Sequence, residues 1–353
     1  MLSIRAAKIG DLQDLMELSA ETGAGMTTMP VDLDSWQKKL KLTEASFCDE
    51  LEDKGKSVFV LVLEDPQTKR VVGTSALIAS VGSNMPFYSY KLSTQVMASK
   101  DLGINTTTHI LNLVNDFTNC TELASLFLSA SYRADTNFRG AGRFLSLARF
   151  LLIHDLPHYF SDRVFAELRG YVDENGESPF WNALGKKFFG LEYSRADLLS
   201  AVSGNQFISD LMPKHPIYLD LLPEQAQEVT GKTNPASEPA RRLLEREGFL
   251  DTGYVDIFDA GPTLECRRQQ IRSLSAAQTG YLLPSNNELT NTKELKGKQV
   301  FMVSNRNAQN YRVVLAEGVS EEEGLKVDQE ALDLLQIDKQ ELVSWTLFGE
   351  ITK

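Results

Sequence analysis

Two kinds of hydrophobic pattern alternate along the chain, one typical of strands and the other of helices. Nearly continuous apolar runs at 57–63, 71–79 and 123–128 predict strands that are buried on both faces of a sheet. Apolar residues three and four positions apart between Leu12 and Leu18 predict an amphipathic helix, which follows a short strand at 2–6. This mixture predicts an α/β fold, in the sense of helices packed on a mixed sheet.

The apolar strand at 123–128 leads through a polar turn to the sequence Arg139-Gly140-Ala141-Gly142-Arg143, which opens an amphipathic helix. Two glycines allow a tight turn and let another group touch the backbone. The free N–H groups of the first helical turn, the positive end of the helix dipole and the two guanidinium groups together predict a phosphate or pyrophosphate site. A tight strand-to-helix connection that binds nothing is the alternative explanation.

Other nucleotide-binding loops fit this chain less well. A dinucleotide loop needs a third glycine where Leu145 stands, and a Walker loop ending at Lys232 needs glycine in place of Ala226. The order strand, R-G-x-G, helix instead resembles the pyrophosphate loop of the GCN5-related N-acyltransferases, where it holds coenzyme A. That family has Gln or Arg three residues before the first glycine, and this chain has Asn137.

Further candidate binding residues stand on the next expected strand, at 163–170. Glu167 and Arg169 would project from one side of it, because alternate residues of a strand share a face. Such a pair forms an ion pair in most strands, but Glu167 near a cofactor loop is also a candidate anchor for a substrate ammonium group. The glycine-rich segment 22–30 and the aromatic segment 86–91 could line the same pocket, or could serve only as a helix connection and as packing.

Composition narrows the class of ligand. The chain has 353 residues, 42% of them hydrophobic, and a net charge of −12, which disfavours a nucleic-acid groove and is compatible with a small cationic substrate. Three separated cysteines and four histidines form no metal-ligand spacing, so we expect no metal site. Neither a signal peptide nor an apolar stretch long enough to cross a membrane is present, and we expect a cytoplasmic protein without a membrane partner.

Two segments resemble the closing unit of an acyltransferase domain, one at 234–258 and an earlier one at 180–185. They predict tandem acyl-CoA N-acyltransferase-like domains. We expect residues 1–200 to form the domain with the coenzyme A loop, 201–275 a second, degenerate half, and 276–353 a small β-rich region. The last region shows no chemistry of its own, and its expected role is to cover a sheet edge or a subunit interface.

Five longer segments, at 22–30, 166–170, 173–181, 211–218 and 253–262, together resemble the arginine N-succinyltransferases. The resemblance covers roughly the part of the chain before the β-rich region. It implies transfer of a succinyl group from succinyl-CoA to the α-amino group of L-arginine, in some members also of ornithine, as the first step of arginine breakdown. It also implies an amino-acid substrate and a homo- or hetero-oligomer.

The same resemblance assigns roles to single residues. Leu126 matches the position that touches succinyl-CoA. Asn234 stands where the family has its proton-donating histidine, and Met97 replaces another family histidine. Asparagine can orient a group or donate a hydrogen bond, but it has no titratable proton near neutral pH. His215 is the histidine that remains nearby.

Two hypotheses follow from these replacements. In the first, the chain is an active amino-acid N-succinyltransferase in which Asn234 positions water or substrate and another residue, such as His215, supplies the proton. In the second, the chain is a catalytically impaired acyl-CoA-binding homologue or subunit that partners an active succinyltransferase.

Overall fold

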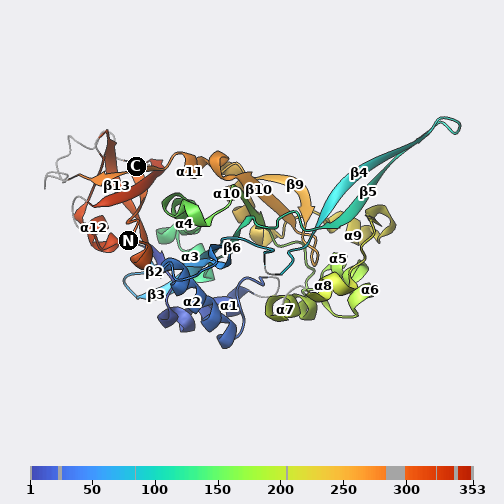
Figure 1. The fold of residues 1–353 in the computed structure, drawn as a ribbon, viewed down its shortest axis with the longest axis horizontal. Helices are drawn as coiled ribbons and strands as arrows, with labels where there is room; N and C mark the ends of the chain where they lie inside the picture. The colour runs from blue at the N-terminus through green and yellow to red at the C-terminus, as the bar shows by residue number, and fades with distance from the viewer. Residues whose placement is uncertain are drawn as a thin grey trace.

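The computed structural model describes residues 2–22, 26–83, 85–203, 206–283, 299–322, 324–337 and 341–350. Fifteen strands of these segments are joined by hydrogen bonds in the order β12-β15-β11-β14-β13-β1-β2-β3-β6-β7-β10-β9-β4-β5-β8. Figure 1 shows an elongated molecule with the C-terminal strands at one end and a long β-hairpin projecting from the other.

The strands are β1 (Ser3–Ala6), β2 (Val58–Asp65), β3 (Arg70–Ile78), β4 (Ser89–Ser99), β5 (Ile104–Val114), β6 (Thr121–Leu128), β7 (Arg163–Glu167), β8 (Ile217–Tyr218), β9 (Leu250–Val255), β10 (Pro262–Arg267), β11 (Gln278–Leu282), β12 (Gln299–Ser304), β13 (Arg312–Glu321), β14 (Gly324–Val327) and β15 (Leu342–Glu350). The α-helices are α1 (Leu12–Thr22), α2 (Leu33–Phe47), α3 (Ala130–Ala134), α4 (Ala141–Asp155), α5 (Pro179–Ala183), α6 (Gly185–Phe189), α7 (Tyr193–Ser203), α8 (Gln206–Leu211), α9 (Glu224–Val229), α10 (Glu238–Arg246), α11 (Arg272–Ser275) and α12 (Gln329–Leu335). Among these described helices, none combines the length and the apolar character needed to cross a membrane.

The N-terminal part of the sheet is covered on both faces, as its apolar strands predict. Alternate residues of β2 contribute to two separate cores: Leu61 and Leu63 belong to the core that contains α4, whereas Val60 and Val62 belong to the core that contains α1 and α2. All four side chains are fully buried. A strand with both faces in a core has to be apolar at every position, which explains the continuous run.

The C-terminal strands close into a ring, because β12 pairs with β13 as well as with β15. Its interior is an apolar core against which α12 packs. The ring joins the main sheet through antiparallel pairing of β13 with β1, for example Ile4 with Val313. The C-terminal region therefore covers the edge of the main sheet.

The mixed α/β fold is confirmed, and some local predictions are corrected. The expected polar turn before Gly140 contains α3, and the expected single helix at 180–189 is divided into α5 and α6 at Leu184. The strand expected at 254–258 is part of β9 and ends at Val255, because the Asp256 carboxylate accepts hydrogen bonds from the N–H groups of Phe258 and Asp259 and turns the chain.

The domain boundaries expected after residues 200 and 275 stay a prediction. Strands from both sides of the first boundary belong to one sheet, since β10 pairs with β7 along its whole length. The hairpin of β4 and β5 was not predicted from the sequence.

Candidate active site

A cavity of about 240 Å³ opens where β6 and β7 separate. The two strands pair in parallel at Thr121 with Val164 and at Glu122 with Phe165, both at the strand starts. Residues 123–126 of β6 and 166–169, at and just after the end of β7, line the cavity on opposite sides. The separation of two parallel neighbours exposes backbone and side chains of both strands to a ligand.

A bulge in β6 shapes one wall of this cavity. Ser125 has a positive φ of 52°, and the register between β3 and β6 shifts beside it. The Ser125 N–H donates to Thr28 Oγ1 (3.1 Å), and its hydroxyl donates to the Thr28 carbonyl oxygen (2.8 Å). These bonds fix the bulge and place Leu126 at the cavity wall.

Below the bulge lies a buried cation beside a buried carboxyl group. Lys39 of α2 donates from Nζ to Ser125 Oγ (3.0 Å) and to the Thr28 carbonyl oxygen. Burial lowers the pKa of Lys39 to about 8, and the nearby Glu122 partly opposes this. Burial likewise raises the pKa of Glu122 to about 7, and Lys39 partly opposes that shift. Glu122 lines the cavity and can exchange a proton near neutral pH.

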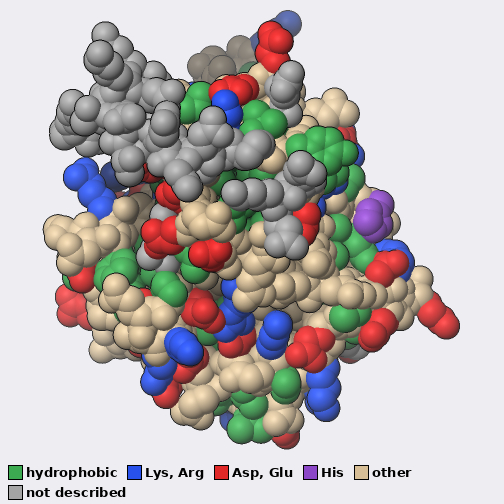
Figure 2. All heavy atoms as spheres, turned by 90° about the vertical axis from the view of Figure 1, so that its left-hand side faces the viewer, with side chains coloured by type: hydrophobic (Ala, Val, Ile, Leu, Met, Phe, Trp, Pro, Cys, Tyr) green, Lys and Arg blue, Asp and Glu red, His purple; other side chains and the backbone are tan. Residues whose placement is uncertain are grey.

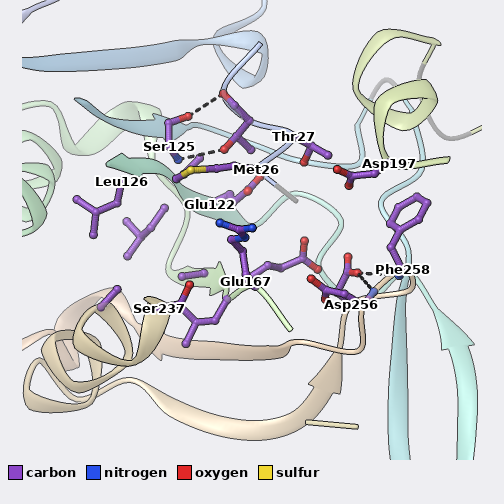
Figure 3. Close-up of a pocket in the computed structure, with 18 of the residues that line it drawn as sticks. Met26, Thr27, Glu122, Ser125, Leu126, Glu167, Asp197, Ser237, Asp256 and Phe258 are labelled. Carbon is purple, nitrogen blue, oxygen red and sulfur yellow. Dashed lines mark hydrogen bonds between the residues drawn. The ribbon is translucent and has the colours of Figure 1, made fainter. Parts of the chain in front are cut away.

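The other end of the cavity is acidic. Figure 3 shows Leu126 and Ser237 at one side, with Asp197, Asp256 and Phe258 at the opposite side. Glu167 lies between them; burial, followed by the charges of Asp256, Glu122 and Asp259, raises its pKa well above the usual value. Its Oε1 is buried and has no hydrogen-bond partner within the described part of the chain. A buried carboxyl oxygen in this state is suited to a cationic ligand.

A tight turn between β9 and β10 holds two of the acidic groups. Asp259 accepts hydrogen bonds from Gly261 N–H (2.8 Å) and, across the end of β7, from Gly170 N–H (2.8 Å). Burial, together with Asp256 nearby, raises the pKa of Asp259 well above its usual value. The turn therefore attaches the acidic end of the cavity to the end of β7.

The glycine loop lies near the C-terminal end of β6, which is Leu128. Gly140 has a positive φ of 93° and caps α4, which begins at Ala141. A Cβ built at Gly142 would lie 3.9 Å from the side chain of Leu128, the last residue of β6. The first N–H groups of α4 have no acceptor within the helix, so they are available to an anion. The predicted order of strand, R-G-x-G and helix is confirmed.

The chain as a whole matches a known enzyme family. Residues 2–273 match the family model described as arginine N-succinyltransferase beta subunit. The chain belongs to the arginine N-succinyltransferase family. It is 37% identical to the arginine N-succinyltransferase of Yersinia pseudotuberculosis serotype O:3 (strain YPIII) over 100% of both chains, and 38% identical to that of Escherichia coli (strain 55989 / EAEC) over 95% of this chain and 94% of the other.

A solved structure is similar over the same length. The arginine/ornithine succinyltransferase subunit AI from Pseudomonas aeruginosa superposes with a TM-score of 0.86 at 32% identity and covers 99% of each chain. The arginine N-succinyltransferase fold therefore extends through the C-terminal ring of strands.

The structure brings some predicted site residues together and separates others. Leu126, Glu167 and Arg169 line the cavity, and so do residues 26–28 of the glycine-rich segment, whose residues 23–25 lie outside the described part of the chain. Asn234 is adjacent: its N–H donates to the Arg169 carbonyl oxygen (2.8 Å), and its side chain caps the turn at Ala236.

The remaining candidates lie away from the cavity. His215 is exposed in the segment before β8, and Met97 is exposed on the projecting hairpin. Arg139 and Ala141 line a second cavity of about 310 Å³, on the side of the loop that faces Leu2 and Leu315.

Sequence reasoning missed Lys39, Glu122, Asp197 and Asp256. Glu122 had a visible signal, since it is an acidic residue at the start of a strand predicted to be fully buried. Lys39 had none, because a lysine on an amphipathic helix normally faces solvent.

Proposed function

We propose that this chain is an arginine N-succinyltransferase, which transfers the succinyl group of succinyl-CoA to the α-amino group of L-arginine, with ornithine as a second acceptor. The observation that carries the proposal is the difference in charge preference between the two ends of β6. A glycine loop suited to a pyrophosphate lies at one end of the strand, and an acidic chamber suited to a cationic amino acid lies beside the other.

Succinyl-CoA would bind with its pyrophosphate at the N–H groups of residues 140–143 and with the guanidinium groups of Arg139 and Arg143 nearby. Its acyl end would then reach Leu126, two residues before the strand end at Leu128, about 7 Å along an extended chain. At the bulge the regular pairing with β3 is interrupted, and backbone groups beside Leu126 would there contact the thioester.

The amino acid would bind at the opposite end. Glu167 would accept hydrogen bonds from a cationic group of the substrate, and Asp197 and Asp256 would add negative charge around it. Arg169 would pair with a carboxylate, which both the amino acid and the succinyl group carry. Binding of a cation favours the ionised form of Glu167 and so lowers the cost of its burial.

For the chemical step, Glu122 is the general base that we propose. It would accept a proton from the α-ammonium group, after which the amine nitrogen attacks the thioester carbonyl carbon. The carbon–nitrogen bond forms, the nitrogen loses its second proton, and the carbon–sulfur bond breaks. The CoA thiolate leaves and takes up the proton that the nitrogen has lost. A base with a pKa of about 7 suits this task near neutral pH.

Asn234 and His215 keep the roles proposed from the sequence. Asn234, bonded through its N–H to Arg169, would orient substrate or water. His215 would supply the proton, and it would have to do so from its place in the exposed segment before β8. We further propose a homo- or hetero-oligomer and a cytoplasmic location.

The test is release of free thiol from succinyl-CoA, with and without L-arginine, by the purified chain and by Asn234→His. The proposal expects arginine-dependent release at enzymatic rates that Asn234→His changes little. The alternative function is a catalytically impaired acyl-CoA-binding homologue or subunit, which the replacement of the family histidine by Asn234 favours. That alternative expects no release from the wild type and restored release in Asn234→His.

A further inference from the structure

The hairpin of β4 and β5 projects from the body as an arm, clearly visible in Figure 1. The two strands pair with each other along their whole length, from Ser89 with Val114 to Ser99 with Ile104. Their pairing with other described strands is confined to the root, where β4 pairs with β9 at residues 90–91 and β5 pairs with β8 at residues 110–111. The outer part of each strand has an open edge.

The direction of the arm is fixed at its root. The carboxylate of Asp220 accepts hydrogen bonds from the Thr108 hydroxyl and from the His109 N–H (2.9 Å). The arm therefore leaves the body at a defined position, beyond which its faces have no cover from the described part of the chain.

Large apolar side chains are exposed on both faces of the arm and at its tip. Val96 and Met97, which are 62% and 45% exposed, are neighbours on one strand and so point to opposite faces. Leu102 at the tip is 72% exposed and Ile104 54%. An isolated two-stranded hairpin is marginally stable in water, and apolar side chains that stay exposed do not increase its stability.

The arm is also nearly free of charge. Between Lys91 and Asp116 the charged residues are Lys100 and Asp101, which are adjacent at the tip and opposite in sign. The end of the molecule formed by the C-terminal strands contrasts with it, because Figure 2 shows acidic and basic side chains mixed across that face. Proteins normally protect open strand edges with charged side chains, and this arm lacks them along the projecting parts of both strands.

We propose that the arm is a dimerisation element that docks on a second copy of this chain. Each copy carries a net charge of −12, so two bodies repel each other, and the uncharged arm is the surface on which two copies meet with least repulsion. A basic partner would instead be attracted to the acidic body. Identical uncharged edges do not repel, and they can pair under two-fold symmetry, the commonest symmetry of oligomers.

The test is the mass of the full-length chain in solution, measured by sedimentation equilibrium over a range of concentrations. The wild type is expected to be a dimer. The double variant Met97→Lys/Ile104→Lys places two charges on one face of the arm, since Ile104 pairs with Ser99 and residues 97 and 99 share a face. It is expected to weaken dimerisation at least tenfold.

A matched control carries the same chemical change on the body. Val31→Lys replaces an apolar side chain that is 58% exposed before α2, and it is expected to leave the dimer intact. A second variant replaces residues 96–107 by Asn-Gly, which shortens the hairpin so that the paired Gln95 and Thr108 close a two-residue turn. It is expected to be monomeric with an unchanged thermal midpoint.

Salt separates this interface from an ionic one. Higher salt screens the repulsion between the two acidic bodies, so dimerisation is expected to hold or to strengthen. A monomeric wild type would overturn the proposal and indicate a different occupant for the arm. Equal dimerisation of the wild type and the arm variants, or a dimer that dissociates as salt rises, would overturn it as well.

Discussion

Glu122 and Glu167 carry the same carboxyl group, and their neighbours give it different chemistry. Glu122 lies near Lys39, whose positive charge limits the effect of burial and leaves a pKa of about 7. Glu167 has carboxyl groups around it, which add to the effect of burial and raise its pKa further. We therefore assign proton transfer to Glu122 and binding of a cation to Glu167.

Replacement of the proposed base tests the first assignment. A base acts in its deprotonated form, so kcat/KM of the wild type is expected to fall as pH decreases through about 7. Glu122→Gln is expected to lose roughly 100-fold in kcat/KM at neutral pH, together with this pH dependence. Glu174→Gln, in an exposed turn, is the matched control. A wild-type pH profile in the Glu122→Gln variant would contradict the assignment.

The same substitution has a predicted effect on stability. Because burial raises the folded-state pKa of Glu122 above its unfolded value, its contribution is fully present below the unfolded pKa and is lost as pH rises through about 7. The free energy of unfolding of the wild type, measured relative to Glu122→Gln, is therefore expected to decrease over this range. Denaturant titrations at several pH values measure it, and a difference independent of pH would be inconsistent with a buried titrating carboxyl group.

The second assignment predicts a defect confined to the amino acid. Glu167→Gln keeps the shape of the side chain and removes its charge, and a hydrogen bond to a charged group contributes about 1.5–3 kcal/mol. KM for L-arginine is expected to rise at least tenfold, while KM for succinyl-CoA stays near the wild-type value. Steady-state kinetics with each substrate varied in turn checks this, and an equal rise in both constants would argue for a structural role.

At the scale of elements, the two glycines at the start of α4 have different roles. Gly140 needs its positive φ of 93° to begin the helix, whereas Gly142 lies inside α4 with space for a Cβ. Gly142 is therefore not required by the backbone conformation. Its absent side chain matters if a phosphate group approaches the helix at this point.

Gly142→Ala is accordingly expected to fold with an unchanged or raised thermal midpoint, because alanine favours helix. Its KM for succinyl-CoA is expected to rise about tenfold, since the methyl group stands where the phosphate would lie. Gly10→Ala, a position with nothing within 4 Å of a Cβ, provides the control. If Gly142→Ala bound succinyl-CoA normally, the pyrophosphate would have to bind elsewhere.

At the scale of the whole molecule, the C-terminal ring of strands is connected to α4 by a buried polar cluster. Asp155, the last residue of α4, has a fully buried side chain. It accepts hydrogen bonds from Tyr311 Oη (2.9 Å), Ser304 Oγ (2.5 Å) and Arg306 Nη1 (3.1 Å), all of which belong to the C-terminal region. This region also reaches the glycine loop, where the Arg143 guanidinium lies 4.5 Å from the centre of the Phe348 ring.

Removal of this carboxylate tests how far the ring supports the body. Asp155→Ala removes the carboxylate that pairs with one cation and accepts hydrogen bonds from two buried hydroxyl groups, which is expected to lower the free energy of unfolding by roughly 3 kcal/mol. Urea titration followed by circular dichroism measures it. Asp328→Ala, which removes only the cap of α12, is the control and is expected to cost about 1 kcal/mol. An equal decrease in the free energy of unfolding in the two variants would show that the cluster does not stabilise the contact between α4 and the C-terminal ring beyond the contribution of one helix cap.

The sequence by itself determined the features that depend on neighbours along the chain. Burial of β2 and β6 on both faces favours apolar residues on both faces, so these strands are visible as nearly continuous apolar runs. The glycine loop is visible because strand, Gly-x-Gly and helix are consecutive, and the family is visible in five ordered segments. The mixed α/β fold and the family were both predicted correctly on these grounds.

The tertiary structure alone decided how distant residues meet. Lys39 lies on a helix whose sequence is compatible with exposure, and the packing of α2 beneath the bulge at Ser125 buries its ammonium group beside Glu122. The arm was missed because its threonine-rich strands bury little apolar surface, so no hydrophobic pattern marks them. A hydrophobic pattern records which positions lose contact with water, whereas a pKa and a binding site depend on charges that approach through space, and the sequence order does not contain those distances.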